Sequence, residues 1–194
     1  MHARINYVDI RPSNFAEVDP FWRETVENYQ GLVRGYFLRD GDSAHTLSVV
    51  LFESESDMKT NTENSLRDTV KKAATHRLSE PVLHHLEVCA HVDQRAGEIT
   101  CARVMDVSLK VDRMPEVIAG WAEGVLAYGD DCKGGYMCGD RSTGKVKSVT
   151  LWSSRGAIEA NEQGGAMQST VGPYKEMMQV PPVASYWDLR VIVG

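Results

Sequence analysis

The hydrophobic pattern of the first half of the chain switches between the period of a strand and that of a helix. From Val18 to Tyr29, apolar residues recur at three- and four-residue steps, which predicts an amphipathic helix that ends before Gly31. The flanking stretches are rich in β-branched and aromatic residues and are bounded by turn residues, as strands are. The predicted elements are strand 3–10, helix 18–29, strands 32–39 and 45–52, helix 55–78 and strand 83–92.

The second half repeats this order of elements. Its predicted elements are strand 99–110, helix 115–128, strands 133–140 and 146–152, helical residues 157–178 and strand 185–193. Each half therefore reads β-α-β-β-α-β, which is the ferredoxin-like unit, a four-stranded antiparallel sheet with both helices on one face.

Identities between the two halves indicate an internal duplication. When the sequence is shifted by 100 residues, Gly35-Tyr36 falls on Gly135-Tyr136 and Ser48-Val49 falls on Ser148-Val149. The register holds for about 30 residues without a gap, which chance similarity between amphipathic segments seldom produces. The polar joint at 93–98 divides the chain into repeats 1–95 and 96–194.

The strands at 45–52 and 146–152 carry apolar residues on both alternating sets of positions, so both faces of each sheet are expected to be buried. The other repeat is the simplest cover for the helix-free face. The sequence therefore predicts an α+β fold in which two ferredoxin-like βαββαβ repeats pack sheet to sheet within one chain. We expect a monomer with a pseudo-dimeric core or a homodimer.

Composition excludes several classes of protein. The chain of 194 residues has a net charge of −6 and no basic cluster, so nucleic-acid binding is not expected. No apolar run is long enough for a signal peptide or a membrane span, which predicts a cytoplasmic protein without a membrane partner. The four cysteines form no C-x-x-C pair and are read as reduced, mostly buried thiols.

Two segments resemble the antibiotic biosynthesis monooxygenase (ABM) domain. They are Gly35-Tyr36-Phe37 with the strand ending at Ser54, and Gly134-Gly135-Tyr136 with Val149-Thr150-Leu151-Trp152-Ser153-Ser154. The family has a glycine-aromatic strand followed by an apolar strand that ends in Trp-x-Ser and then a helix. The resemblance covers both repeats and implies a dimeric α/β barrel formed by one chain.

The ABM resemblance implies several site residues. It places Asn6 where oxygenase and haem-degrading members point an asparagine into their pocket, while an asparagine bonded to a neighbouring loop is the structural alternative. Trp152 matches the Trp-x-Ser tryptophan, and Tyr36 matches the aromatic residue of the glycine-aromatic strand. Both are therefore expected to bind substrate. Core packing is the alternative for Trp152. Asn61 replaces a tryptophan that haem-degrading members carry, and we expect it to face a smaller ligand.

All six histidines lie in repeat 1. His76 resembles the family's histidine on the second helix, after a five-residue insertion is allowed for, and His85 is the second candidate base because His84 and His85 point to opposite faces of a strand. The alternative for His76 is an exposed helix histidine. The spacing of residues 76, 84 and 85 is not that of a zinc site, so no metal is expected.

The function predicted from these residues is cofactor-independent oxygenation of a hydrophobic aromatic substrate of polyketide, quinol or anthrone type. Asn6 with His76 or His85 would be catalytic, in a cavity of repeat 1. No cofactor is expected, since the chain has no phosphate-binding glycine motif. The alternatives are a non-catalytic barrel that binds a ligand or a partner, and haem binding or degradation.

Overall fold

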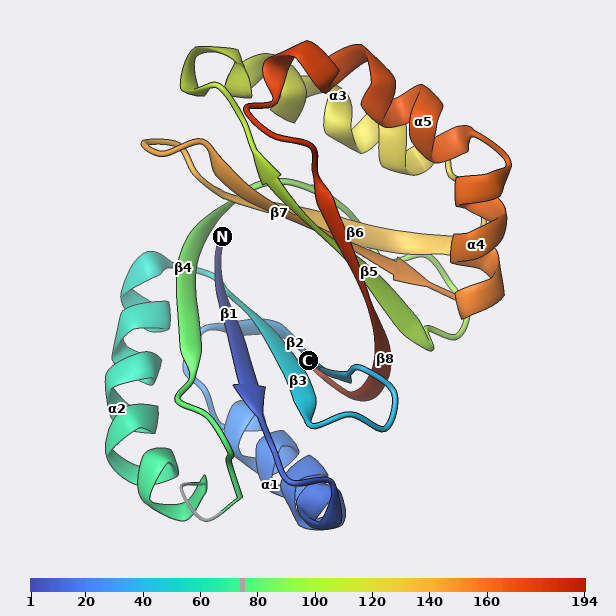
Figure 1. Ribbon diagram of the computed structural model, residues 1–194. Helices are drawn as coiled ribbons and strands as arrows, with labels where there is room; N and C mark the ends of the chain where they lie inside the picture. Colours follow the sequence, from blue (N-terminus) through green and yellow to red (C-terminus); the bar gives the residue numbers. More distant parts are fainter. Residues whose placement is uncertain (74–75) are drawn as a thin grey trace. The chain divides into compact units, whose positions relative to one another are not determined.

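The structure is a computed structural model (Figure 1). It describes residues 1–73 and 76–194, and within these the side chains of all but residues 65–73. The chain divides into two compact units. Unit 1 is Met1–Glu87 together with Trp187–Gly194, and unit 2 is Val88–Tyr186. The units thus differ from the sequence repeats in that each includes the end of a strand that begins in the other.

Unit 1 contains the first βαββαβ set. Its elements are β1 (His2–Asp9), a 3₁₀ turn η1 (Pro12–Asn14), α1 (Phe15–Glu27), β2 (Leu32–Arg39), β3 (His45–Phe52), α2 (Glu55–Ala73) and the first part of β4 (Val82–Val92). β1 lies between β3 and β4, and β2 lies between β3 and the end of the last strand, β8 (Val183–Val193).

Unit 2 contains the second set. Its elements are β5 (Cys101–Ser108), η2 (Val111–Arg113), α3 (Met114–Leu126), β6 (Cys132–Asp140), β7 (Lys145–Trp152), α4 (Arg155–Gln163), α5 (Ala166–Val171), η3 (Gly172–Met177) and the first part of β8. β7 pairs antiparallel with β5 on one side and with β6 on the other.

In the part of the chain that the structure describes, the hydrogen-bonded strand order is β1-β3-β2-β8-β5-β7-β6-β4, and it closes between β4 and β1. The two long strands β4 and β8 take part in both units. The predicted α+β fold with two ferredoxin-like βαββαβ units is confirmed.

The predicted helical residues 157–178 form three short helical elements and not one helix. The chain forms α4, α5 and η3 instead, because Gly165 has a φ of 80° and Pro173 removes a backbone donor at the start of η3. The predicted helix at 55–78 also ends early. α2 stops at Ala73, residues 74–75 lie outside the described residues, and Arg77 already forms a β-bridge with Ile10.

Each unit has its own hydrophobic core between its sheet and its helices. In unit 1 the stripe Val18, Trp22 and Val26 of α1 packs on Phe37, in a cluster that also includes the β8 residues Val191 and Val193. In unit 2, Trp121 and Val125 of α3 take part in the corresponding cluster, which includes Trp152. No helix of the described residues is long and apolar enough to cross a membrane.

Candidate functional site

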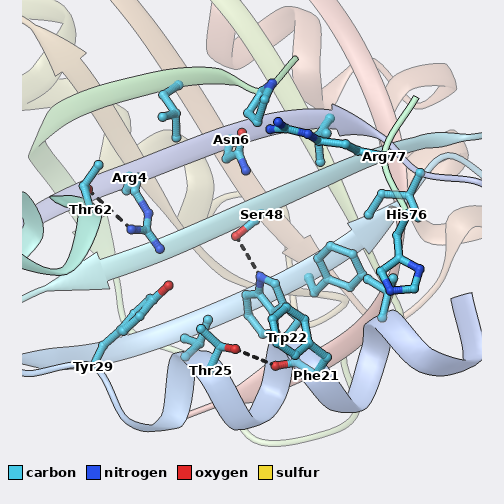
Figure 2. A pocket seen from close by; sticks show the side chains of 17 residues that line it. Arg4, Asn6, Phe21, Trp22, Thr25, Tyr29, Ser48, Thr62, His76 and Arg77 are labelled. Carbon is cyan, nitrogen blue, oxygen red and sulfur yellow. Dashed lines mark hydrogen bonds between the residues drawn. The ribbon is translucent and has the colours of Figure 1, made fainter. Parts of the chain in front are cut away.

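A cavity of about 160 Å³ lies in unit 1 between the sheet and its two helices. Figure 2 shows its lining side chains, which come from β1, β2 and β3, from α1 and α2, and from the segment 76–83 that leads into β4. Apolar and aromatic groups form most of the wall. An engineered cavity of about 150 Å³ with such a wall holds benzene, so a space of this size and character can hold an aromatic ring.

β1 and its extension give the cavity one row of side chains. Arg4, Asn6, Val8 and Ile10 all line it. They follow each other at two-residue steps, and residues at this spacing share one face of a strand. At about 3.3 Å per residue the row is roughly 20 Å long. The cavity therefore has an Arg4 end and an Ile10 end, with Asn6 between them.

Trp22 forms the aromatic wall opposite this row. Its ring stacks on Phe37 with the ring centres 5.3 Å apart and 24° between the planes. Its indole nitrogen donates a hydrogen bond of 3.1 Å to the Ser48 hydroxyl on β3. The ring can lie this close to β2 because Gly35 has no side chain, and a Cβ there would come within 3.0 Å of Trp22. The sheet thereby fixes the orientation of the wall.

Asn6 lies in the middle of β1, opposite Ser48 on β3 and Leu83 on β4. Its side-chain oxygen Oδ1 is buried and has no hydrogen-bond partner among the described residues. Leaving a buried acceptor unpaired costs about 1–3 kcal/mol, and most such groups in proteins are paired. Because Asn6 also lines the cavity, a ligand bound there is a candidate for the missing hydrogen-bond donor.

His76 reaches the cavity from the segment after α2, near the Ile10 end (Figure 2). Its Nδ1 atom is also buried and without a partner among the described residues. On its other side, Nε2 lies 3.9 Å from a carboxylate oxygen of Glu17 on α1. The imidazole can accept a proton at Nδ1, and Glu17 is placed to stabilise the resulting cation.

Arg4 is the buried charge of the cavity. The residue is only 8% exposed, and its Nη1 atom donates a hydrogen bond of 3.3 Å to the hydroxyl of Thr62 on α2. The guanidinium also lies over the Tyr29 ring, 4.9 Å from its centre. Thr62 is the only hydrogen-bond partner of Arg4 among the side chains that the structure describes.

The structure brings Asn6 and His76 to the same cavity but does not bring His85 there. His85 lies on β4 opposite Arg4, at the exposed surface, with Nε2 3.4 Å from the Thr62 hydroxyl. Desolvation by the surrounding groups, followed by the charges of Arg4 and Lys59, lowers the pKa of His85. His85 thus lies on the same face of the sheet as Arg4 and contacts Thr62, the hydrogen-bond partner of Arg4.

Asn61 and Tyr36 lie outside the lining of this cavity. Asn61 is buried on α2, where its amide donates to the carbonyls of Gln30 and Asp57 and accepts from the Gln30 N–H. It holds the turn after α1 to α2. Tyr36 is fully buried on β2, and its side chain points to the opposite face of the sheet from that of the cavity-lining residue Phe37, because neighbouring strand residues alternate.

Trp152 is a core residue of unit 2. Its indole nitrogen donates to the Thr150 hydroxyl at 2.9 Å, and its ring stacks on Tyr128 at 5.7 Å. Only 1% of its surface is exposed, and it is not among the residues that line the smaller cavity of unit 2. The structure thus gives Trp152 a packing role.

The smaller cavity of unit 2, about 60 Å³, occupies the place that corresponds to the unit 1 cavity. Met105 stands where β1 has Asn6. Gly120 and Gly124 on α3 leave room for Tyr174 and Thr170, since a Cβ at Gly124 would lie 2.3 Å from the Thr170 methyl group. Residues of α5 and η3 therefore fill much of this space.

No three histidine, cysteine, aspartate or glutamate side chains of the described residues come together as a metal site requires. The four cysteines are free thiols, and all except the partly exposed Cys89 are buried. Burial raises the pKa of the Cys132 and Cys138 thiols. These thiols stay protonated, which makes them poor nucleophiles.

Arg4, Trp22 and Ser48 line the cavity but were not among the site residues predicted from the sequence. A signal for all three was present, because Arg103, Trp121 and Ser148 stand at the corresponding places of the second repeat. When residues with polar groups recur at the same place in both repeats, on faces predicted to be apolar, they indicate positions that form hydrogen bonds in the folded protein.

The fold is shared with several solved structures, although no family model and no curated protein sequence matches the chain. A candidate monooxygenase from Fusobacterium nucleatum matches with a TM-score of 0.77 at 11% identity, over 98% of this chain and 93% of that one. An anthrone oxidase-like protein matches with a TM-score of 0.71 at 15% identity, over 99% of this chain and 92% of that one.

A third structure links the fold to the resemblance in the sequence. It is a ferredoxin-fold protein from Listeria monocytogenes that is related to antibiotic biosynthesis monooxygenases, with a TM-score of 0.58 at 8% identity, over 97% of this chain and 94% of that one. Likeness at such identities concerns the fold and not the reaction. The chain therefore has the tandem ferredoxin-like fold of ABM-related proteins.

Proposed function

We propose that the unit 1 cavity binds a hydrophobic aromatic substrate with an acidic proton and that the protein oxygenates this substrate without a cofactor. The observation that carries the proposal is the pair of buried, unpartnered polar atoms at one cavity, Oδ1 of Asn6 and Nδ1 of His76. Both are hydrogen-bond acceptors in an otherwise largely apolar space. A substrate with an acidic O–H or C–H group supplies the missing donor.

The walls of the cavity suit a planar ring system. Phe21 and Trp22 of α1 and Phe37 of β2 all line it, and aromatic faces stack well on aromatic ligands. Polar side chains from several elements, such as Asn6, Ser48 and His76, are placed among these apolar groups. This is the general character of small-molecule sites, in which apolar walls give affinity and a few polar groups give orientation.

His76 acts as the base in this proposal. A neutral imidazole takes the acidic proton of the substrate at Nδ1, and the Glu17 carboxylate near Nε2 stabilises the imidazolium that forms. Before proton transfer, Oδ1 of Asn6 accepts a hydrogen bond from a substrate hydroxyl group other than the group that His76 deprotonates. After transfer, a half-turn of its amide brings the N–H groups to the new oxyanion, as an oxyanion-hole donor does.

Molecular oxygen is the oxidant and the substrate is the only reductant. The deprotonated substrate passes one electron to O₂, and the substrate radical and superoxide then combine to form a C–O bond. Protonation and loss of water break the O–O bond of this peroxide. The sum for an anthrone-type methylene is CH₂ + O₂ → C=O + H₂O, which balances in atoms and electrons.

Oxygen uptake tests this proposal. The purified protein is screened against anthrones and quinols, and the rate is compared with that of spontaneous oxidation and with that of two variants, Asn6→Ala and His76→Ala. Loss of one oxyanion donor lowers turnover by roughly 10². The matched control is Met105→Ala, which changes the equivalent position in unit 2 and should leave turnover unchanged.

The outcomes separate the alternatives. Oxygen uptake that equals spontaneous oxidation for every compound, together with saturable binding of the same compounds, would show a non-catalytic ligand-binding barrel. A saturable Soret shift on titration with haemin, abolished in His76→Ala, would instead support the haem alternative.

A further inference from the structure

Two buried arginines occupy equivalent positions in the two units. Arg4 lies on β1 and Arg103 on β5, and each is the third residue of the first strand of its unit. Each guanidinium lies over two aromatic rings at similar distances. These pairs are Arg4 with Tyr29 at 4.9 Å and Phe52 at 5.7 Å, and Arg103 with Tyr128 at 5.1 Å and Trp152 at 5.2 Å.

The two arginines differ in the group that balances their charge. Nη1 of Arg103 lies 3.3 Å from a carboxylate oxygen of Glu162 and donates to the amide oxygen of Asn161 at 3.2 Å. In unit 1 the residue that corresponds to Glu162 is Thr62, whose neutral hydroxyl accepts from Arg4. No carboxylate among the described side chains forms an ion pair with Arg4.

A buried guanidinium without a counter-ion is unfavourable, because the protein interior solvates a charge less well than water does. Unit 2 offsets this cost with Glu162 and fills the space beside it. Unit 1 instead has a cavity beside the arginine, and Figure 2 shows the Arg4 guanidinium at one end of it, between Thr62 and Tyr29. Among the side chains that the structure describes, a cavity thus takes the place that a carboxylate has in unit 2.

We infer that the ligand of the unit 1 cavity is an aromatic anion whose negatively charged group pairs with Arg4, in the place that the Glu162 carboxylate takes beside Arg103. The inference rests on the proposed function in that it assigns the substrate class of the same cavity. The shared chemistry is a carboxylate or phenolate on a ring system. Asn6 lies two residues along β1, roughly 7 Å from Arg4, so a ligand held at Arg4 extends its rings beneath Asn6.

Binding of matched probes tests the inference without any turnover. 2-Naphthoate and 2-naphthamide have nearly the same shape but differ in charge, and benzoate with benzamide forms a one-ring pair. The dissociation constants are measured by quenching of tryptophan fluorescence, since Trp22 lines the cavity, and by calorimetry. We expect each anion to bind at least about tenfold more tightly than its amide, because hydrogen bonds to charged groups are the stronger ones.

The variants Thr62→Glu and Thr62→Gln test the role of the missing carboxylate. Thr62→Glu recreates in unit 1 the pair that Arg103 and Glu162 form, and it should abolish the preference for the anion. Thr62→Gln introduces a side chain of the same size without charge and should keep the preference. Glu162→Gln in unit 2 is the control and should leave both dissociation constants unchanged.

Equal affinity of the wild type for anion and amide would overturn the inference, and so would an unchanged preference in Thr62→Glu. The proposed oxygenation fails separately. Preference for the anion without oxygen uptake would leave the inference standing and refute the oxygenase. Oxygen uptake with neutral quinols alone, without any preference for anions in binding, would support the oxygenase and overturn the inference.

Discussion

The indole nitrogen of Trp22 and the hydroxyl oxygen of Ser48 lie 3.1 Å apart, and this hydrogen bond from α1 to β3 has an exact counterpart of 3.0 Å between Trp121 and Ser148. The same pair thus fixes the first helix of each unit to the central strand of its sheet. In unit 1 it also orients the aromatic wall of the larger cavity.

Removal of this hydrogen bond should affect the two units differently. Ser48→Ala and Ser148→Ala each leave an indole N–H without its partner, so each should lower the free energy of unfolding by about 1 kcal/mol in urea titrations. Only Ser48→Ala should also weaken binding of 2-naphthoate. An equal loss of binding in Ser148→Ala would show that the ligand does not depend on the unit 1 wall.

We expect that the side chain of Asn6 binds a ligand and that its buried, unpartnered oxygen lowers the stability of the protein. Asn6→Leu removes the buried, unpartnered oxygen and adds apolar volume next to a cavity, so it should raise the free energy of unfolding by about 1–2 kcal/mol while ligand binding is lost. Met105→Leu at the equivalent position is the control, with a change below about 1.5 kcal/mol. A destabilised Asn6→Leu protein would instead indicate that the amide is structural.

The glycines of α3 are predicted to make room for α5. Gly124→Ala places a methyl group against Thr170 and should destabilise the protein by about 1–3 kcal/mol, although alanine is the better helix former. In a Thr170→Ala background the same substitution should become stabilising by up to about 1 kcal/mol. Thermal unfolding of the wild type, the two single variants and the double variant checks this change of sign. A loss of stability of the same size in both backgrounds would contradict it.

Two histidines should change the pH dependence of stability in opposite directions. The pKa of His85 is lowered in the folded protein, so below its ordinary value near 6.5 the unfolded chain takes up a proton that the folded one does not, and stability falls as the pH decreases. The pKa of His45 is raised by its hydrogen bond to Asp9 and by the charge of that carboxylate, so its contribution is present at low pH and is lost as the pH rises through the raised value.

Urea titrations at pH 5.5 and 7.5 measure these contributions. His85→Gln should reduce the loss of stability on acidification, and His45→Gln should increase it, relative to the wild type. Both residues are exposed, so solvent screening keeps both effects small. Effects of the same sign in the two variants would contradict the assignment.

Separation of the repeats should prevent folding. A fragment of residues 1–95 lacks the end of β8, which pairs with β2 and contributes Val191 and Val193 to the unit 1 core. We expect this fragment to aggregate or to unfold without a cooperative transition in circular dichroism. A monomeric fragment with a cooperative transition would contradict the pseudo-dimeric arrangement.

Much of the candidate site follows from local patterns, but the state of each polar atom does not. The alternation of β1 and the ABM resemblance lead to Asn6, and the position after the second helix leads to His76. Whether their buried atoms have partners depends on groups from α1, β3 and β4, which are distant in sequence. The same reason separates Asn61 from the cavity, because only the packed structure shows its amide bound to Gln30 and Asp57.

The sequence by itself determined the repeated βαββαβ order, because hydrophobic period, turn residues and the identities at a shift of 100 residues are all local or pairwise features of the chain. Only the tertiary structure decided that the end of β8 completes unit 1 and that Arg4 faces Thr62 where Arg103 faces Glu162. Both facts depend on side chains and strands from distant parts of the chain. Their energies arise from burial and charge in the folded protein, which no periodicity of the sequence records.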